Sequence, residues 1–179
     1  ETHLSNFTPV NRGTANNQVW ITEAGDLRGP VTDTLEDAFI LANQIYTGLV
    51  TLKSNAWLFW WLRPNGTPSG NATLLSNNTL EEEVIVYKRA YALGNFSKFI
   101  RPGAKVIDIT SNSYSGGLKV VNFKNEDNSI IIVMINETES VLKYSIDFSS
   151  HFTQARIEDY ITSSDKNLEQ LDSSSTTTG

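Results

Sequence analysis

One carboxylate follows a short apolar run that predicts a strand. The run Val19-Trp20-Ile21 is β-prone and continues through Thr22 to Glu23, shortly before Gly25. The glycine relaxes the backbone into a loop, so Glu23 is expected where a strand ends. In a parallel βα barrel, a carboxylate at such a point can attack an anomeric carbon or activate a water molecule. A solvated loop residue or a helix cap is the alternative, and the strand end alone leaves it open.

A second apolar run, residues 56–62, brings aromatic and basic side chains to the same predicted edge. Trp60 and Trp61 are expected on opposite faces by strand alternation, so that one of them faces the barrel axis. An indole there can stack on the apolar face of a sugar ring, and a core position between strand and helix is its alternative. Arg63 is expected either to orient Glu23 or meet substrate hydroxyls, or to form a surface ion pair.

Composition narrows the remaining chemistry. The chain has no cysteine and two histidines, His3 and His151, so disulfides, thiol catalysis and a metal site are not expected. His3 is a candidate to line the site, with an inert position as its alternative, and His151 is expected on a surface loop. The formal net charge of -6 argues against nucleic acid and anionic membrane as partners. The chain has no apolar run long enough to span a bilayer, and no cofactor is expected.

The elements that must position these side chains change character near residue 103. Upstream, apolar strands alternate with two helical patterns, from residue 35 to 52 and from Thr79 to about Phe99, which is typical of parallel βα units. A capping box is expected to open each helix. The expected pairs are Asp33 with Glu36 and Thr79 with Glu82.

Downstream of residue 103, short strands separated by turn residues predict antiparallel β structure. Residues 125–128 are expected to form a hairpin turn. The Ser- and Thr-rich end is of low complexity and is expected to be a linker or a frayed tail. The expected strands lie near residues 105–110, 118–123, 130–135, 141–148 and 155–161.

The chain contains more N-glycosylation sequons than its composition predicts. By chance about three or four are expected. The excess favours a secreted, extracellular glycoprotein. Asn95 falls in the predicted helix that ends near Phe99, so its modification is in question. The six sequons are at Asn6, Asn65, Asn71, Asn77, Asn95 and Asn136.

Several of these segments together resemble glycoside hydrolase family 30. Residues 19–23 are similar to the nucleophile strand of that family, and residues 56–63 to its eighth barrel strand. Residues 87–103 are similar to the last barrel helix and its exit, and residues 163–168 to a late turn of the side domain. The resemblance covers about residues 18–168. Within the family, these segments resemble the xylanase and glucuronoxylanase branch most.

The resemblance implies an α/β plus all-β fold. Residues 1–103 would be the C-terminal portion of a (β/α)8 TIM barrel, and residues 104–170 an incomplete β-sandwich side domain. Residues 171–179 would form the low-complexity tail. The remaining barrel strands would lie upstream of residue 1, so the missing N-terminal half of the barrel is an expected partner.

The resemblance also implies an activity, namely that of a retaining glycosidase acting on xylan or a related β-glycan. Glu23 would be the catalytic nucleophile, and Trp60 and Trp61 would border the sugar subsite. The general acid/base would lie upstream of residue 1, so the chain alone is expected to be inactive.

Two positions depart from the family pattern. Ser5 stands at the place of a site tyrosine, and Pro64 stands where glucuronoxylanases carry a second arginine, so strict dependence on a glucuronate branch is in doubt. An endo-β-1,6-glucanase or -galactanase of the same family therefore remains an alternative. A non-catalytic carbohydrate-binding module or a truncated gene product is another.

Overall fold

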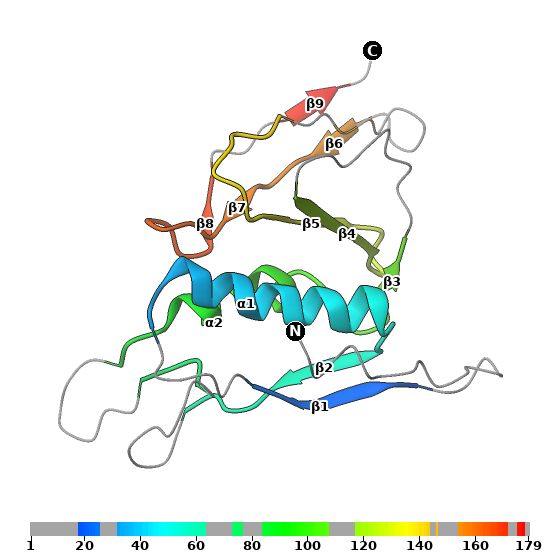
Figure 1. The fold of residues 1–179 in the computed structure, drawn as a ribbon. Coiled ribbons are helices and arrows are strands. Elements are labelled where there is room, and N and C mark those ends of the chain that lie inside the picture. Colours follow the sequence, from blue (N-terminus) through cyan, green and yellow to red (C-terminus); the bar gives the residue numbers. More distant parts are fainter. Residues whose placement is uncertain are drawn as a thin grey trace. The chain divides into compact units, whose positions relative to one another are not determined.

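The computed structural model describes part of the 179-residue chain, and its contacts divide it into two compact units, Glu1–Ala90 and Tyr91–Gly179. The first unit holds a parallel strand pair and the second holds antiparallel strands, so the change of character expected from the sequence is present (Figure 1). The boundary between the two units falls after Ala90, inside helix α2 (Lys88–Ser97). The described residues are 18–25, 32–63, 73–76, 84–107, 117–143, 146, 154–171 and 175–177.

The first unit is built on a strand–helix–strand crossover. Strands β1 (Trp20–Ala24) and β2 (Ala56–Phe59) pair in parallel. Helix α1 (Leu35–Tyr46) lies between them in sequence and runs beside them in space (Figure 1). Parallel strands need such a crossover because a short hairpin cannot join them. The described residues thus contain one βα unit of the kind that the sequence predicts.

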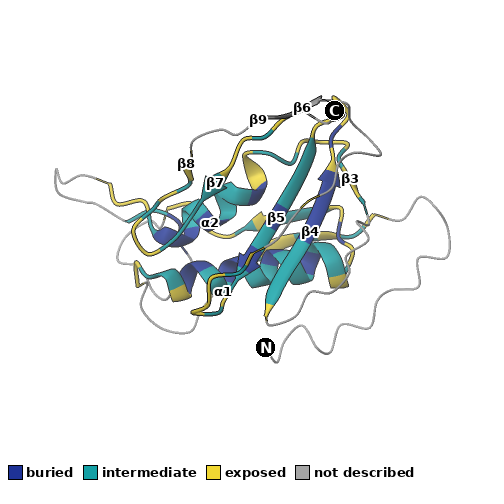
Figure 2. Ribbon diagram, turned by 90° about the horizontal axis from the view of Figure 1, so that it is seen from above, coloured by how far each residue is buried: buried dark blue, intermediate teal, exposed yellow. Residues whose placement is uncertain are grey.

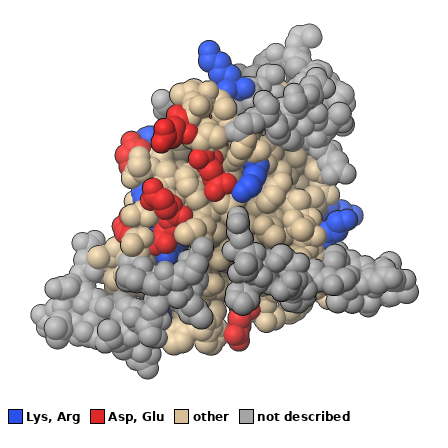
Figure 3. Space-filling view, viewed as in Figure 1, with Lys and Arg blue, Asp and Glu red and all other residues tan. Residues whose placement is uncertain are grey.

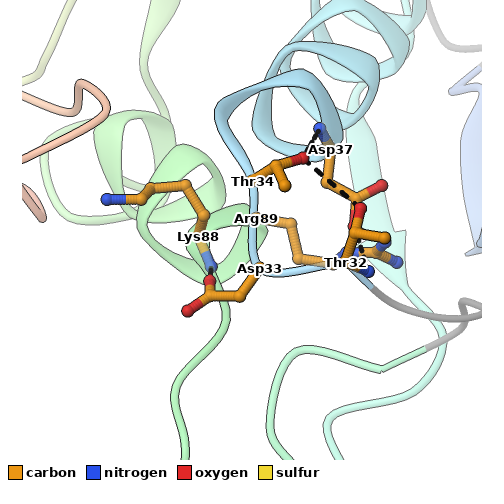
Figure 4. Close-up of polar contacts among 6 residues, drawn as sticks. All are labelled: Thr32, Asp33, Thr34, Asp37, Lys88 and Arg89. Atoms are coloured by element: carbon orange, nitrogen blue, oxygen red, sulfur yellow. Dashed lines mark hydrogen bonds and ion pairs between the residues drawn. The ribbon is translucent and has the colours of Figure 1, made fainter.

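Helix α1 is capped by Thr34, so the expected box of Asp33 with Glu36 is wrong. Thr34 has an extended backbone with φ of -118°, and its Oγ1 accepts a hydrogen bond from the N–H of Asp37 at 3.4 Å. Asp33 is used elsewhere, since its Oδ1 accepts the N–H of Lys88, the first residue of α2, at 2.6 Å (Figure 4). Adjacent residues therefore cap two different helices.

One face of α1 is buried, and it differs slightly from the predicted one. Buried stretches lie along the helix in Figure 2. Leu41 is buried although it is not part of the face that helical spacing predicts, whereas Phe39, which is part of it, is only half-buried. That predicted face consists of Leu35, Ala38, Phe39, Ala42, Ile45, Tyr46 and Leu49. The spacing of three and four residues keeps the buried side chains on one side of the helix. The buried apolar residues of α1 are Ala38, Leu41, Ala42 and Ile45.

The segment after α1 changes to a π-helical turn, η1 (Thr47–Thr51), and approaches both strands closely at Gly48. A Cβ added to Gly48 would lie 2.8 Å from Trp57 Cδ1 and 2.9 Å from Ile21 Cδ1. The Gly48 carbonyl also accepts bonds from the N–H and the hydroxyl of Ser54, both at 2.9 Å. A glycine is therefore required where the helical connection meets the sheet.

The second predicted helix begins later than expected. Residues 84–87 are not helical, and Val86 forms an isolated antiparallel bridge with Leu75. Helix α2 begins only at Lys88, while the predicted box of Thr79 with Glu82 lies outside the described residues. The run Val84-Ile85-Val86 is β-branched throughout, which favours an extended chain over a helix.

The second unit consists of short antiparallel sheets around one long hairpin. The turn expected at residues 125–128 is confirmed, because the N–H of Asn125 donates to the carbonyl of Ser129 at 3.0 Å and Asn128 has φ of 69°. The order of the main sheet is β3-β4-β5, and two smaller sheets pair β6 with β9 and β7 with β8. The strands are β3 (Lys105–Val106), β4 (Leu118–Lys124), β5 (Ile130–Asn136), β6 (Gln154–Arg156), β7 (Tyr160–Ile161), β8 (Glu169–Gln170) and β9 (Ser175–Thr177).

Strands β4 and β5 carry the apolar centre of this unit. Both strands carry buried stretches (Figure 2). Val121 pairs with Val133, and both are buried, as are Phe123 and Ile135. These branched and aromatic side chains suit a half-buried pleated surface. The long hairpin is therefore the element of the second unit that the sequence specifies most strongly.

The chain near its C-terminal end differs from the sequence expectation. In the strand expected at residues 141–148, the described residues 141–143 and 146 belong to no strand, and the other residues lie outside the description. Strand β9 lies in the segment expected to be a frayed tail, yet it pairs antiparallel with β6. Threonine is a good strand former, and composition alone does not reveal a pairing partner.

Within the described ranges, neither helix combines the length and the apolar character needed to cross a bilayer. On the face drawn in Figure 3, the Lys and Arg side chains of the described residues lie apart from one another. They form no continuous basic patch on that face.

Candidate functional site

Glu23 lies near the C-terminal end of β1, where the pairing with β2 shifts by one residue. Ile21 pairs with Trp57 and Ala24 pairs with Phe59, so three steps along β1 match two steps along β2. Thr22 and Glu23 fall within this irregularity, and both are exposed. A bulge re-aims side chains and is over-represented next to active sites.

The other end of β1 is held by Asn55, a residue that sequence reasoning missed. Asn55 Oδ1 accepts the N–H of Val19 at 3.0 Å, and the N–H of Asn55 donates to the carbonyl of Val19 at 2.7 Å. This two-way bond fixes the start of β1 beside the start of β2. The only sequence signal was an asparagine directly before an apolar run, which by itself indicates no more than a turn.

Trp60 follows β2 directly and is bonded to the Glu23 end of β1. Its N–H donates to the carbonyl of Ala24 at 2.8 Å. Its ring meets that of Trp61 edge to face, with centroids 5.4 Å apart and planes at 88°, and the peptide bond between the two residues is cis. The expectation that the two indoles point to opposite faces is wrong, because β2 ends at Phe59 and strand alternation does not extend beyond it.

Both indoles are accessible. Trp60 is 50% exposed and Trp61 is 37% exposed, which leaves aromatic surface open to a ligand. Arg63 follows them and is also exposed. The backbone thus brings together the Glu23 end of β1 and the tryptophan pair, with Arg63 two residues farther along. His3, the remaining predicted site residue, lies outside the described residues, as do Ser5 and Pro64.

The parallel strand pair has one covered and one open face. Ile21 and Trp57 point toward the helical connection at Gly48, so the alternate residues of each strand lie on the opposite face. On that face Trp20 is 60% exposed and Leu58 is 47% exposed. Parallel sheets occur almost only with both faces covered, so an open apolar face of this kind is unusual.

The described side chains offer no metal centre. Across the ranges that the structure describes, no three or more His, Cys, Asp or Glu side chains are grouped so that they could hold a metal ion. Glu23 lies near the end of β1, and the N–H bond from Trp60 to the Ala24 carbonyl brings the backbone of the exposed tryptophan pair to the same end.

The second unit is similar to a known domain family. Residues 103–178 match a family model described as the glycosyl hydrolase family 30 beta sandwich domain. This range contains strands β3 to β9. The C-terminal part of the chain is therefore similar to the β-sandwich domain of glycoside hydrolase family 30.

Relatives and solved structures extend this similarity toward the first unit. The chain is 27% identical over 154 residues to the glucuronoxylanase XynC of Bacillus subtilis, which covers 85% of this chain and 33% of that protein. It resembles a family 30 endoxylanase from Clostridium papyrosolvens with a TM-score of 0.68 and 28% identity, over 92% of this chain and 38% of the other. It also resembles a family 30 subfamily 8 xylanase from Clostridium acetobutylicum with a TM-score of 0.69 and 25% identity, over 88% and 36% of the two chains.

These comparisons confirm the resemblance that the sequence motifs suggest. The chain is similar to the C-terminal portion of family 30 xylanases. It spans about a third of the length of the curated relatives that it matches.

Proposed function

We propose that this chain is the C-terminal part of a retaining glycoside hydrolase of the endo-β-1,4-xylanase or glucuronoxylanase type. In this proposal β1, α1 and β2 belong to a (β/α)8 barrel, and Glu23 is the catalytic nucleophile. The observation that carries it is the position of Glu23 near the C-terminal end of a parallel strand, next to an exposed tryptophan pair. Active sites of such barrels lie at that end of the strands.

The proposed reaction has two displacements. The Glu23 carboxylate attacks the anomeric carbon while the bond from that carbon to the leaving oxygen breaks, and a second carboxylic acid protonates that oxygen. Water then attacks the glycosyl ester, the second carboxylate takes its proton, and Glu23 is released. Retention requires the two carboxyl groups about 5–5.5 Å apart. We propose that the second one belongs to a part of the protein outside these 179 residues.

The substrate proposal rests on the tryptophan pair and on the relatives. Trp60 and Trp61 offer exposed ring surface, and the N–H of Trp60 bonds to the carbonyl of Ala24, the residue after the proposed nucleophile. The C–H face of a xylose unit can stack on such a surface. The relatives are named as xylanases or glucuronoxylanases. Arg63 and His3 complete the proposed substrate contacts. Reducing-sugar assays on xylan, glucuronoxylan, β-1,6-glucan and β-1,6-galactan distinguish this proposal from the β-1,6 alternatives.

The assignment of Glu23 as the nucleophile is tested by trapping the covalent glycosyl-enzyme intermediate. The full-length protein is incubated with a fluorinated xylobioside that has a good leaving group, so that the glycosyl-enzyme ester accumulates, and peptide mass spectrometry locates the ester. We expect it on Glu23. Glu23→Gln should lower turnover by at least about 10³-fold and leave substrate binding in place, because the amide does not attack.

A matched control is Glu36→Gln, an exposed carboxylate in the first turn of α1. It should leave turnover unchanged. An ester on another carboxylate, or normal turnover of the Glu23 variant, would exclude Glu23 as the nucleophile.

We also propose that the protein is secreted. The excess of sequons supports this, since N-glycosylation takes place in the secretory pathway. Fractionation of the native source tests it, and protein confined to the cells would contradict it.

A further inference from the structure

Two sequons lie among the described residues, and their asparagines have opposite surroundings. Asn95 is in helix α2, and Asn136 is the last residue of strand β5. N-glycosylation replaces one hydrogen of the side-chain nitrogen Nδ2 by a large, hydrated oligosaccharide. The folded protein tolerates this only where that nitrogen can point an additional group into solvent.

Asn95 has no room for such a group. Its Nδ2 donates to the carbonyl of Tyr91 at 2.8 Å and to Thr162 Oγ1 at 2.6 Å, so both of its hydrogens are used. The same Thr162 hydroxyl accepts the N–H of Leu168 at 3.2 Å. A glycan on Asn95 would therefore break the contact through which residues 162–168 pack against α2.

The close packing at the neighbouring residue supports this conclusion. Gly94 lies so near Leu168 that an added Cβ would come within 2.7 Å of Leu168 Cδ2. The segment that carries Leu168 therefore lies directly against this turn of α2. Folding and modification at Asn95 thus exclude each other.

Asn136 has the opposite arrangement. Its Oδ1 accepts the N–H of Thr138 at 3.0 Å and the Thr138 hydroxyl at 2.7 Å, so the two polar residues of the sequon are bonded to each other. Its Nδ2 makes one bond among the described residues, to the carbonyl of Ser140 at 3.1 Å, which leaves its second hydrogen for substitution. Glu137, Glu139 and Ser140 are all exposed.

The turn that carries Asn136 is held without the substitutable hydrogen. Glu137 forms an ion pair with Lys119 of β4 at 2.7 Å, and a Cβ added to Gly117 would lie 3.0 Å from the Thr138 methyl group. Asn136 itself pairs with Leu118 in the strand ladder. A glycan on Nδ2 would therefore leave the support of the turn in place.

We propose that Asn136 is an N-glycosylation site of this protein and that Asn95 is not. The donor class is an oligosaccharide linked to a lipid pyrophosphate. A bond forms between Asn136 Nδ2 and the anomeric carbon of the first sugar, the bond from that carbon to the pyrophosphate breaks, and a base takes the Nδ2 proton. This inference rests on the proposed secretion of the protein, and not on Glu23 or on the substrate.

Glycopeptide mass spectrometry of the wild-type, full-length protein secreted by a eukaryotic host tests the proposal. We expect the peptide with Asn136 to carry a glycan and the peptide with Asn95 to be unmodified. Enzymatic deglycosylation in isotope-labelled water should then convert Asn136, and not Asn95, to labelled aspartate. An unmodified Asn136 would overturn the assignment, and a glycan on Asn95 in the folded protein would overturn the exclusion.

Variants add a matched comparison. Asn136→Gln and Thr138→Val should each remove one glycan, seen as a faster-migrating band, whereas Thr138→Ser keeps the hydroxyl and should keep the glycan. Asn95→Gln should leave the glycan pattern unchanged. If the Asn136 variant is not secreted, the wild-type peptide map still decides the question.

Discussion

Gly48 determines how closely the helical connection approaches the parallel strands. Its missing side chain leaves room for Trp57 and Ile21, which come from different strands. One residue therefore limits the distance between the two layers. The nearer neighbour is the edge of the Trp57 indole, a rigid ring that cannot bend aside as the end of a flexible side chain can.

We predict that Gly48→Ala destabilises the first unit. The new methyl group would lie 2.8 Å from Trp57 Cδ1 and 2.9 Å from Ile21 Cδ1, both inside normal contact distance. Overpacking of this kind costs about 1–3 kcal/mol of unfolding free energy. Calorimetry of the full-length protein measures it. Gly94→Ala is the control, because the near atom there is the end of one leucine side chain, and a smaller loss is expected.

At the same scale, the sequence identified some site residues and missed others for a physical reason. Glu23 could be found because a β-prone run and a nearby glycine are local signals. The shift of register beside it and the two-way bond to Asn55 could not be found, because both depend on which strand lies alongside. The relation of Trp60 to Trp61 was predicted wrongly because element ends are the least reliable part of a pattern.

Among the elements, α1 and α2 are joined at their N-terminal ends by a buried ion pair. Arg89 Nη2 lies 2.6 Å from Asp37 Oδ2, and the two side chains are 2% and 7% exposed (Figure 4). Asp37 Oδ2 also accepts the N–H of Thr32 at 3.0 Å. Together with the bond from Lys88 to Asp33, these contacts fix where each helix starts.

We predict that Arg89→Met lowers the unfolding free energy of the first unit by about 3–5 kcal/mol, because it leaves the Asp37 carboxylate buried without its counter-charge. Adding Asp37→Leu should recover part of the loss, so the double variant should be more stable than the sum of the single ones. Urea denaturation of the full-length protein with hydrogen exchange of the α1 amides measures this.

The surface pair of Lys119 with Glu137 serves as the control for that ion pair, since its side chains are 38% and 35% exposed. Lys119→Met should change stability by about 1 kcal/mol or less. A comparable loss in both variants, or strictly additive single variants at Asp37 and Arg89, would contradict a specific role for the buried pair.

The start of α2 shows why an element can escape local prediction. Its first N–H bonds to Asp33, a residue 55 positions earlier, so the signal that starts the helix is not in its own segment. The β4–β5 hairpin is the opposite case. Its apolar strand residues and its polar turn are neighbours in sequence, and the predicted ranges match the observed strands almost to the residue.

At the scale of the whole molecule, the most informative feature is the exposed apolar face of the β1–β2 strand pair. Trp20 and Leu58 are apolar, lie on the face away from the helical connection, and are 60% and 47% exposed. Large exposed apolar surface marks an interaction site or a risk of aggregation. A barrel interior would cover it, and the similarity of this chain to about a third of each xylanase relative is consistent with that explanation.

We therefore predict that the purified 179-residue chain neither hydrolyses xylan nor remains a single monomeric species. Catalysis should fail because retention needs a second carboxyl group about 5–5.5 Å from the first, which we propose lies outside this chain. Self-association should follow from the open apolar face and strand edge. Reducing-sugar assays and sedimentation velocity measure the two properties. Replacing Trp20 and Leu58 by Thr should reduce the association without creating activity, since it makes the face polar and supplies no acid.

Release of reducing sugar from xylan by the purified chain would refute the prediction of inactivity. A monodisperse wild-type monomer with one cooperative calorimetric transition would refute the prediction of self-association.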